Sequence, residues 1–169
     1  MAITYNLITS STVALGGTAQ VDFNSIPQTY TDLLIKTSTN VNTFNVLRIR
    51  FNGVSSSDYT QKILRGSGVG ANSYSNAGWD LLTAFSPSYN SGVANTFTNN
   101  EYYITDYTKS FSKSILGDSA QEDNGTVAYS VLYAGLLNTS SAITSISIFP
   151  QSDNFNQYST FYLYGIKNS

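Results

Sequence analysis

The chain has 169 residues, with 8 basic and 10 acidic side chains and neither histidine nor cysteine. These counts exclude a Ser-His-Asp triad, a thiol nucleophile, a disulfide and a conventional zinc site. The formal net charge of -2 provides no basic surface for a nucleic acid, so we expect no nucleic-acid partner.

Uncharged polar and aromatic residues dominate the composition. Ser, Thr and Asn supply 61 of the 169 residues, and 13 more are Tyr. Hydrophobic residues make up 41% of the chain, which is far from the composition of a disordered protein. Because domains average roughly 150 residues, the length predicts a single domain over residues 1–169.

The N-terminus carries no recognisable targeting signal. Its first ten residues have neither a basic start nor the apolar run of a signal peptide. No stretch approaches the roughly 18 apolar residues of a membrane span, so we expect no membrane partner. A chain without cysteine needs no oxidising compartment to fold, and we expect synthesis in a cytoplasm.

Hydrophobic and polar residues alternate along most of the chain, which is the period of a β-strand with one buried face. In the stretch 46–51, for example, Arg48 and Arg50 would share the outer, solvated face of a strand. The same alternation occurs at residues 3–7, 18–23 and 127–134. Other stretches are apolar on both faces, as in strands at the centre of a sandwich or strands whose outer face meets a partner; these are residues 33–35, 143–149 and 161–166.

Turn-forming segments separate these stretches. Gly16 and Gly17 predict a hairpin turn, and the Gly/Ser/Asn-rich segment 66–78 predicts a flexible loop. Further loops are predicted at 86–95, 118–125 and 150–159, with a turn near 106–112. Nine or ten short strands with no helical period predict an all-β fold. Because long loops suit Greek-key crossovers, the prediction is an antiparallel β-sandwich of jelly-roll type.

Carboxylates give little sign of a catalytic or metal site. Asp118, Glu122 and Asp123 form the one acidic cluster, which either holds Ca²⁺ without the spacing of an EF-hand or is a solvated polar loop. Glu101 stands beside two tyrosines that could face a sugar, but glycoside hydrolysis needs two carboxylates across one cleft. The segment Gly66–Gly70 lacks the lysine and helix of a phosphate loop. We therefore expect neither an enzyme nor a cofactor.

Tyrosine is the residue type that most suggests a binding surface, because it offers a large rigid contact area with a polar tip. The alternative is ordinary strand propensity, which also favours tyrosine. Trp79, the sole tryptophan, is expected to anchor the core. The candidate partner-contact residues are Tyr89, Tyr102, Tyr103, Tyr107, Tyr162 and Tyr164.

Three stretches carry a resemblance to a known group of proteins. They read FNSIPQTYTDLL at 23–34, RFNG at 50–53 followed by Asp58-Tyr59, and STFYLYGIK at 159–167. In this order they resemble small virion structural proteins of tailed bacteriophages. None of the three contains a catalytic motif, so the resemblance concerns architecture and location and names no active site.

The resemblance implies a virion location, with assembly in the host cytoplasm. It suggests a capsid decoration (cement) protein, a homotrimer that binds the major capsid protein between neighbouring subunits. Such a protein stabilises the shell because it binds the assembled state. The rival within the same group is a tail-fibre or appendage module that binds a host receptor or glycan through its loops.

Overall fold

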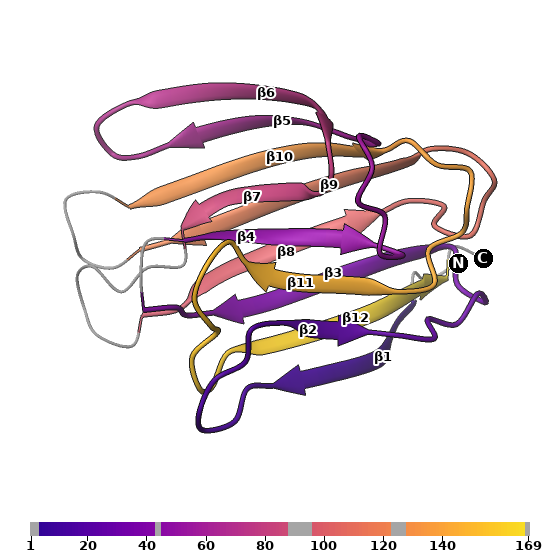
Figure 1. Ribbon diagram of the computed structural model, residues 1–169, viewed down its shortest axis with the longest axis horizontal. Coiled ribbons are helices and arrows are strands. Elements are labelled where there is room, and N and C mark those ends of the chain that lie inside the picture. The colour runs from indigo at the N-terminus through magenta and orange to yellow at the C-terminus, as the bar shows by residue number, and fades with distance from the viewer. Residues whose placement is uncertain (1–3, 43–44, 88–95, 123–127, 168–169) are drawn as a thin grey trace.

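The computed structural model describes residues 4–42, 45–87, 96–122 and 128–167. In these ranges the chain forms two antiparallel sheets that pack face to face, so the predicted β-sandwich of jelly-roll type is confirmed (Figure 1). The larger sheet has eight strands in the spatial order β1 (Thr4–Thr12), β12 (Thr160–Lys167), β3 (Asp32–Thr39), β8 (Thr98–Ile104), β9 (Lys113–Gln121), β10 (Tyr129–Leu137), β5 (Tyr59–Gly66) and β6 (Ala71–Trp79). The smaller sheet has four, in the order β2 (Val21–Phe23), β11 (Ile146–Pro150), β4 (Val46–Phe51) and β7 (Leu82–Pro87). None of the described residues forms a helix long and apolar enough to cross a membrane.

Most neighbouring strands are distant in sequence, because the chain repeatedly crosses between the sheets. The predicted hairpin at Gly16 and Gly17 is therefore wrong, although the turn itself is present. Strand β1 pairs with β12 in the larger sheet, and β2 pairs with β11 in the smaller one. The two glycines lie in the connection that takes the chain from β1 in the larger sheet to β2 in the smaller sheet.

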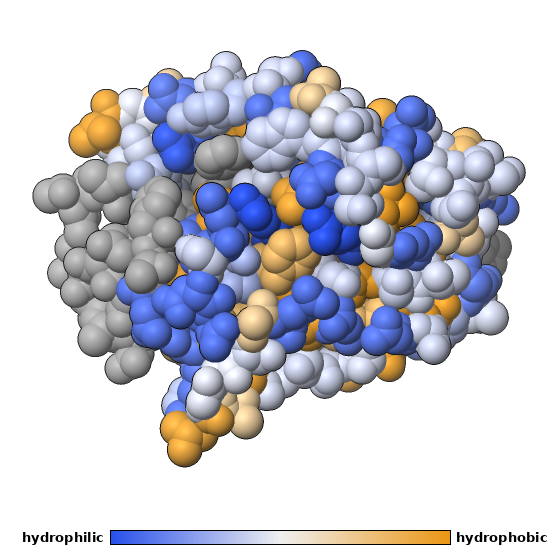
Figure 2. All heavy atoms as spheres, in the orientation of Figure 1, coloured by the Kyte–Doolittle hydropathy of each residue, from blue (hydrophilic) through white to orange (hydrophobic). Residues whose placement is uncertain are grey.

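The alternation of buried and exposed residues follows from the sandwich, since each strand turns one side to the other sheet. In β4, Leu47, Ile49 and Phe51 point into the core, and Arg48 and Arg50 lie on the outer face, as predicted. The Arg50 Nη2 atom is 3.0 Å from Asp80 Oδ2. Figure 2 shows the outer side of the four-stranded sheet covered by hydrophilic and weakly polar residues, with hydrophobic ones only in scattered spots.

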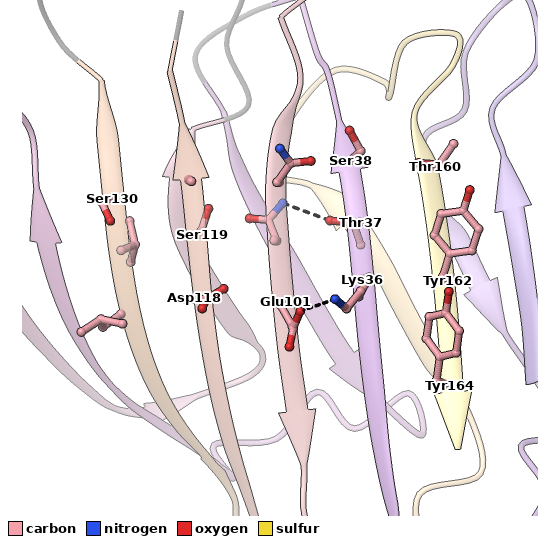
Figure 3. Close-up of a pocket in the computed structure, with 15 residues that line it drawn as sticks. Lys36, Thr37, Ser38, Glu101, Asp118, Ser119, Ser130, Thr160, Tyr162 and Tyr164 are labelled. Carbon is pink, nitrogen blue, oxygen red and sulfur yellow. Dashed lines mark hydrogen bonds and ion pairs between the residues drawn. The ribbon is translucent and has the colours of Figure 1, made fainter. Parts of the chain in front are cut away.

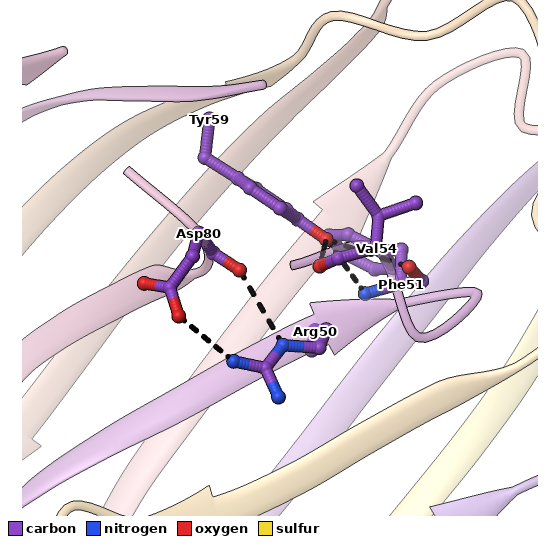
Figure 4. Close-up of polar contacts among 5 residues, drawn as sticks. All are labelled: Arg50, Phe51, Val54, Tyr59 and Asp80. Atoms are coloured by element: carbon purple, nitrogen blue, oxygen red, sulfur yellow. Dashed lines mark hydrogen bonds and ion pairs between the residues drawn. The ribbon is translucent and has the colours of Figure 1, made fainter. Parts of the chain in front are cut away.

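Tyr59 connects the two sheets through the core (Figure 4). Its ring is fully buried and stacks near Phe51, with ring centroids 6.4 Å apart. Its hydroxyl accepts a hydrogen bond from the Phe51 backbone N–H at 3.0 Å and lies 3.3 Å from the Val54 carbonyl oxygen. Burial raises the pKa of this phenol above its ordinary value.

Two predicted loops are strands instead. Residues 71–78 of the expected flexible segment lie in β6, which pairs with β5 after a tight turn closed by the Ser67 N–H to Gly70 carbonyl bond. Strand β9 extends to Gln121, so Asp118 lies in a strand and not in an acidic loop. Both segments are rich in small polar residues because one of their faces is exposed to solvent. The predicted loop 86–95 begins within β7, and residues 88–95 lie outside the described residues.

Two buried tyrosines give a matched test of the core. Tyr133 donates a hydrogen bond to Gln61 Oε1 at 3.1 Å, whereas the fully buried Tyr102 hydroxyl has no hydrogen-bond partner among the described residues. We expect Tyr133→Phe to lower the free energy of unfolding by about 1 kcal/mol and Tyr102→Phe to raise it by about 1 kcal/mol. Urea denaturation of the two variants checks this difference. Equal destabilisation by both would contradict it.

Candidate functional site

The outer face of the eight-stranded sheet is the candidate functional surface. Because the strand registers are continuous, its side chains form rows that cross the sheet. The middle row, named here the charged row, consists of Tyr162, Lys36, Glu101, Asp118, Leu132 and Leu64. On one side of it lies a row of short side chains, namely Thr160, Ser38, Asn99, Ala120 and Ser130. On the other side lies an apolar row, namely Leu7, Tyr164, Leu34, Tyr103 and Leu116.

A groove lies over the charged row and the row of short side chains (Figure 3). Its volume is about 630 Å³, and its lining includes Lys36, Asn99, Glu101, Asp118, Tyr162 and Tyr164. We call it the tyrosine groove. The groove forms because the row of short side chains, which comes from five adjacent strands, lies next to the longer side chains of the charged row. Its volume falls in the range of small-molecule sites, roughly 300–1,000 Å³.

Charge in the tyrosine groove is arranged around one ion pair. Lys36 Nζ lies 2.7 Å from Glu101 Oε2, and both side chains are about half exposed, at 51% and 45%. Hydrogen bonding to Glu101 raises the pKa of Lys36, and the negative charge of the same carboxylate adds to the effect. Asp118 is directly opposite Glu101 on the next strand. The groove therefore carries two carboxylates and one ammonium.

Two aromatic rings form one side of the groove. Tyr162 and Tyr164 point to the same face of β12, with ring centroids 6.4 Å apart and an angle of 24° between the ring planes. Figure 3 looks onto this face and shows both rings nearly broadside, one above the other along the strand. Both are partly buried. They provide a flat aromatic platform beside the Lys36–Glu101 pair.

An apolar patch adjoins the groove at its other end. Leu64, Leu116 and Leu132 are 52%, 64% and 57% exposed, and together they line a second hollow of about 500 Å³. We call these three residues the leucine patch. Leu132 lines both hollows, so the patch and the groove form one continuous surface. Half-exposed leucines clustered on a regular sheet are typical of a contact surface for another molecule.

The structure brings three of the six predicted contact tyrosines to this surface. Tyr162 and Tyr164 line the tyrosine groove. Tyr103 lies nearby, with its hydroxyl donating to Asp32 Oδ2 at 2.6 Å. These residues are therefore placed where they could contact a partner.

The other three tyrosines do not join this surface. Tyr102 and Tyr107 are buried in the core, so their prediction as contact residues is wrong. Neighbouring residues of a strand point to opposite faces, so Tyr102 faces inward because Tyr103 faces outward. The Tyr102 ring packs edge-on against Tyr133, with ring centroids 6.0 Å apart. The Tyr107 hydroxyl donates to the Pro27 carbonyl oxygen inside the fold. Tyr89 lies outside the described residues.

Two carboxylates of the tyrosine groove lie on neighbouring strands. Glu101 and Asp118 lie side by side on β8 and β9 and point to the same face of the sheet, whereas a glycosidase holds its two carboxylates on either side of the bond that it cleaves. Glu101 is half exposed and is paired with Lys36. Among the residues that the structure describes, no three potential metal-ligating side chains gather into a cluster. Of the acidic cluster in the sequence, Asp123 is outside the described ranges.

The three leucines of the patch were not predicted from the sequence. Each one alternates with inward-facing residues in its strand, as Leu132 does with Val131 and Tyr133. An outward leucine in an alternating strand is the signal that could have identified them. Residues 127–134 were recognised as a strand, but the outward position of Leu132 was not used.

Comparisons with known proteins give only a distant likeness of fold. No protein-family model matches the chain, and no curated protein sequence matches it. Among solved structures, the chain is similar to the crystal structure of galectin LEC-6 from Caenorhabditis elegans, at 11% sequence identity and a TM-score of 0.37. The match covers 94% of this chain and 96% of the galectin.

Proposed function

We propose that this protein is a structural protein of a bacteriophage virion, a capsid decoration (cement) protein that adheres through the leucine patch and catalyses no reaction. The observation that carries the proposal is the contrast between the two faces of the sandwich. The face of the four-stranded sheet is polar and internally hydrogen-bonded, for example by Ser147 and Asp22 at 2.6 Å. The face of the eight-stranded sheet exposes clustered leucines.

The leucine patch can supply useful binding energy. Covering the exposed half of a leucine side chain contributes about 1 kcal/mol, so the three leucines contribute roughly 3 kcal/mol per copy. A cement protein adds this energy to the assembled shell alone, because its binding surface spans neighbouring capsid subunits. A homotrimer around a local symmetry axis of the shell would engage three such patches together. The resemblance of residues 23–34 and 159–167 to phage virion proteins supports the same location.

Reconstitution of stripped particles tests this proposal. Particles freed of the protein are expected to release their genome at a lower temperature, and added wild-type protein is expected to restore the original temperature. The double variant L116E/L132E should fail to restore it, because two carboxylates placed in an apolar contact weaken binding roughly 100-fold or more. L15E is the matched control, since Leu15 is almost fully exposed in the turn after β1 and lies outside the patch.

Two outcomes would reject the cement role. One is that stripped and intact particles resist heat equally well. The other is that L116E/L132E restores resistance as fully as L15E does. Circular dichroism of each variant checks that it is folded before it is added.

A second candidate is a tail-fibre or appendage module that binds a host receptor or glycan. The tyrosine groove favours it, because the groove offers polar groups and aromatic rings on one surface. The number of copies per particle separates the two candidates. Hundreds of copies indicate a shell protein, and a handful indicate a tail component.

A further inference from the structure

We infer that the tyrosine groove is a binding site for an uncharged saccharide chain, with sugar rings stacked on Tyr162 and Tyr164 and their hydroxyls bonded to Lys36, Glu101 and Asp118. This inference rests on the groove alone and holds whether the protein sits on a shell or on a tail. The proposed site lies on the outer face of the eight-stranded sheet, whereas the sequence analysis expected a glycan to bind through the loops.

The aromatic platform provides the apolar half of such a site. A pyranose ring has one face formed by C–H bonds, and this face packs against the electron-rich face of an aromatic ring. Tyr162 and Tyr164 present two rings whose planes differ by 24° and whose centroids are 6.4 Å apart. Because both are partly buried on a regular strand, little side-chain freedom is lost when a sugar binds. Two rings in line along β12 suit consecutive sugars of a chain better than a single monosaccharide.

The polar half of the site lies directly beside the platform. Lys36 is opposite Tyr162 in the register of β12 and β3, and Glu101 and Asp118 continue the same row. The Lys36–Glu101 contact at 2.7 Å holds both groups in place. Carboxylates accept and an ammonium donates hydrogen bonds, so together they can bind neighbouring hydroxyls of one sugar. Bonds to charged groups are stronger than bonds between neutral ones.

The charges of the groove define the class of saccharide. Two carboxylates and one ammonium give a net charge of -1 on the charged row, which repels sulfated or carboxylated sugars. The adjoining row of Ser38, Asn99 and Ser130 adds only neutral groups. An uncharged saccharide therefore fits the tyrosine groove best.

An apolar peptide is a poorer occupant of the same groove. It would remove water from Lys36, Glu101 and Asp118 without replacing the lost hydrogen bonds, at a cost of several kcal/mol in desolvation. The three leucines of the patch carry no charge themselves, although Lys62 lines the same hollow, and their apolar surface better suits a protein. The two halves of the face are thus suited to different ligands.

Titration of the intact chain with neutral oligosaccharides tests the inference. The probes are hexasaccharides of glucose, mannose, galactose and N-acetylglucosamine, each added up to about 10 mM, with a hyaluronan hexasaccharide as the anionic comparison. Backbone amide resonances provide the readout. At least one neutral probe should shift the resonances of residues on β3, β8 and β12, and Y162A should weaken its binding at least tenfold. Y158A is the matched control, because Tyr158 is exposed in the loop before β12, and it should leave the affinity unchanged.

A second variant keeps the test valid if Y162A does not fold. D118A removes an exposed carboxylate from the sheet surface and should also weaken binding at least tenfold. The inference is overturned if no neutral probe shifts these resonances, if Y162A or D118A binds as tightly as Y158A, or if the anionic probe binds best. None of these results bears on the heat resistance of reconstituted particles, so failure here is distinct from failure of the cement proposal.

Discussion

Replacing Phe155 with alanine should lower the free energy of unfolding by about 3–5 kcal/mol. Phe155 lies in the polar loop that the sequence predicts at 150–159, yet its ring is fully buried. The ring packs edge-on against Phe161 with centroids 4.8 Å apart, and its backbone forms bridges with Thr18 and Val41. It therefore ties together three segments at one end of the sandwich. Since domains of this size are stable by only about 5–15 kcal/mol, this loss would remove a large share of the total stability.

Chemical denaturation measures this loss as a lower midpoint with an unchanged slope. Tyr158→Asn is the control within the same loop. Tyr158 is exposed and has a positive φ of 72°, a conformation that asparagine tolerates better than tyrosine, so its stability should be unchanged or slightly higher. If Phe155→Ala cost no more than this control, the loop would not be anchored as described.

The sequence predicts the inside of this sandwich better than its outer surface. Alternation alone placed Arg48 and Arg50 on an outer face and identified the strand around Tyr133, because burial of every second residue leaves a clear period. Strand β6 was missed because its composition is that of a loop. As an edge strand with one face in solvent, it needs few hydrophobic residues to pair with β5.

The tyrosine groove could not be predicted, because its residues come together only through strand order. Tyr162, Lys36, Glu101 and Asp118 are neighbours across four strands whose sequence positions are widely separated. Topology of this kind leaves no local signal in the sequence. The pair Tyr102 and Tyr103 is a different case. Adjacent residues of one strand point to opposite faces, so a strand prediction at this position would have shown that only one of them can be exposed.

Replacing Gly165 with alanine should destabilise the fold by about 1–3 kcal/mol, because the ring of Tyr30 occupies the space that a Cβ atom would need. A Cβ built on Gly165 would lie 2.3–2.6 Å from three ring carbons of Tyr30. Gly165 lies in β12 between two paired strands, opposite Asn6 on one side and Leu33 on the other, so its backbone cannot move away. The Tyr30 ring, which packs against the core, must therefore leave its position.

Gly66→Ala is the matched control, since Gly66 also belongs to a strand of the same sheet but has no atom within 4 Å of the added carbon. Its stability should be unchanged or slightly higher, because alanine reduces the freedom of the unfolded chain. The double variant Gly165→Ala with Tyr30→Ala should cost less than the sum of the two single changes, as removal of the ring also removes the clash. Strictly additive costs in urea denaturation would show that another contact restricts position 165. In that case the absence of a side chain at Gly165 would not be what allows the Tyr30 ring to pack against β12. This packing is on the side of the strand opposite the Tyr162–Tyr164 platform.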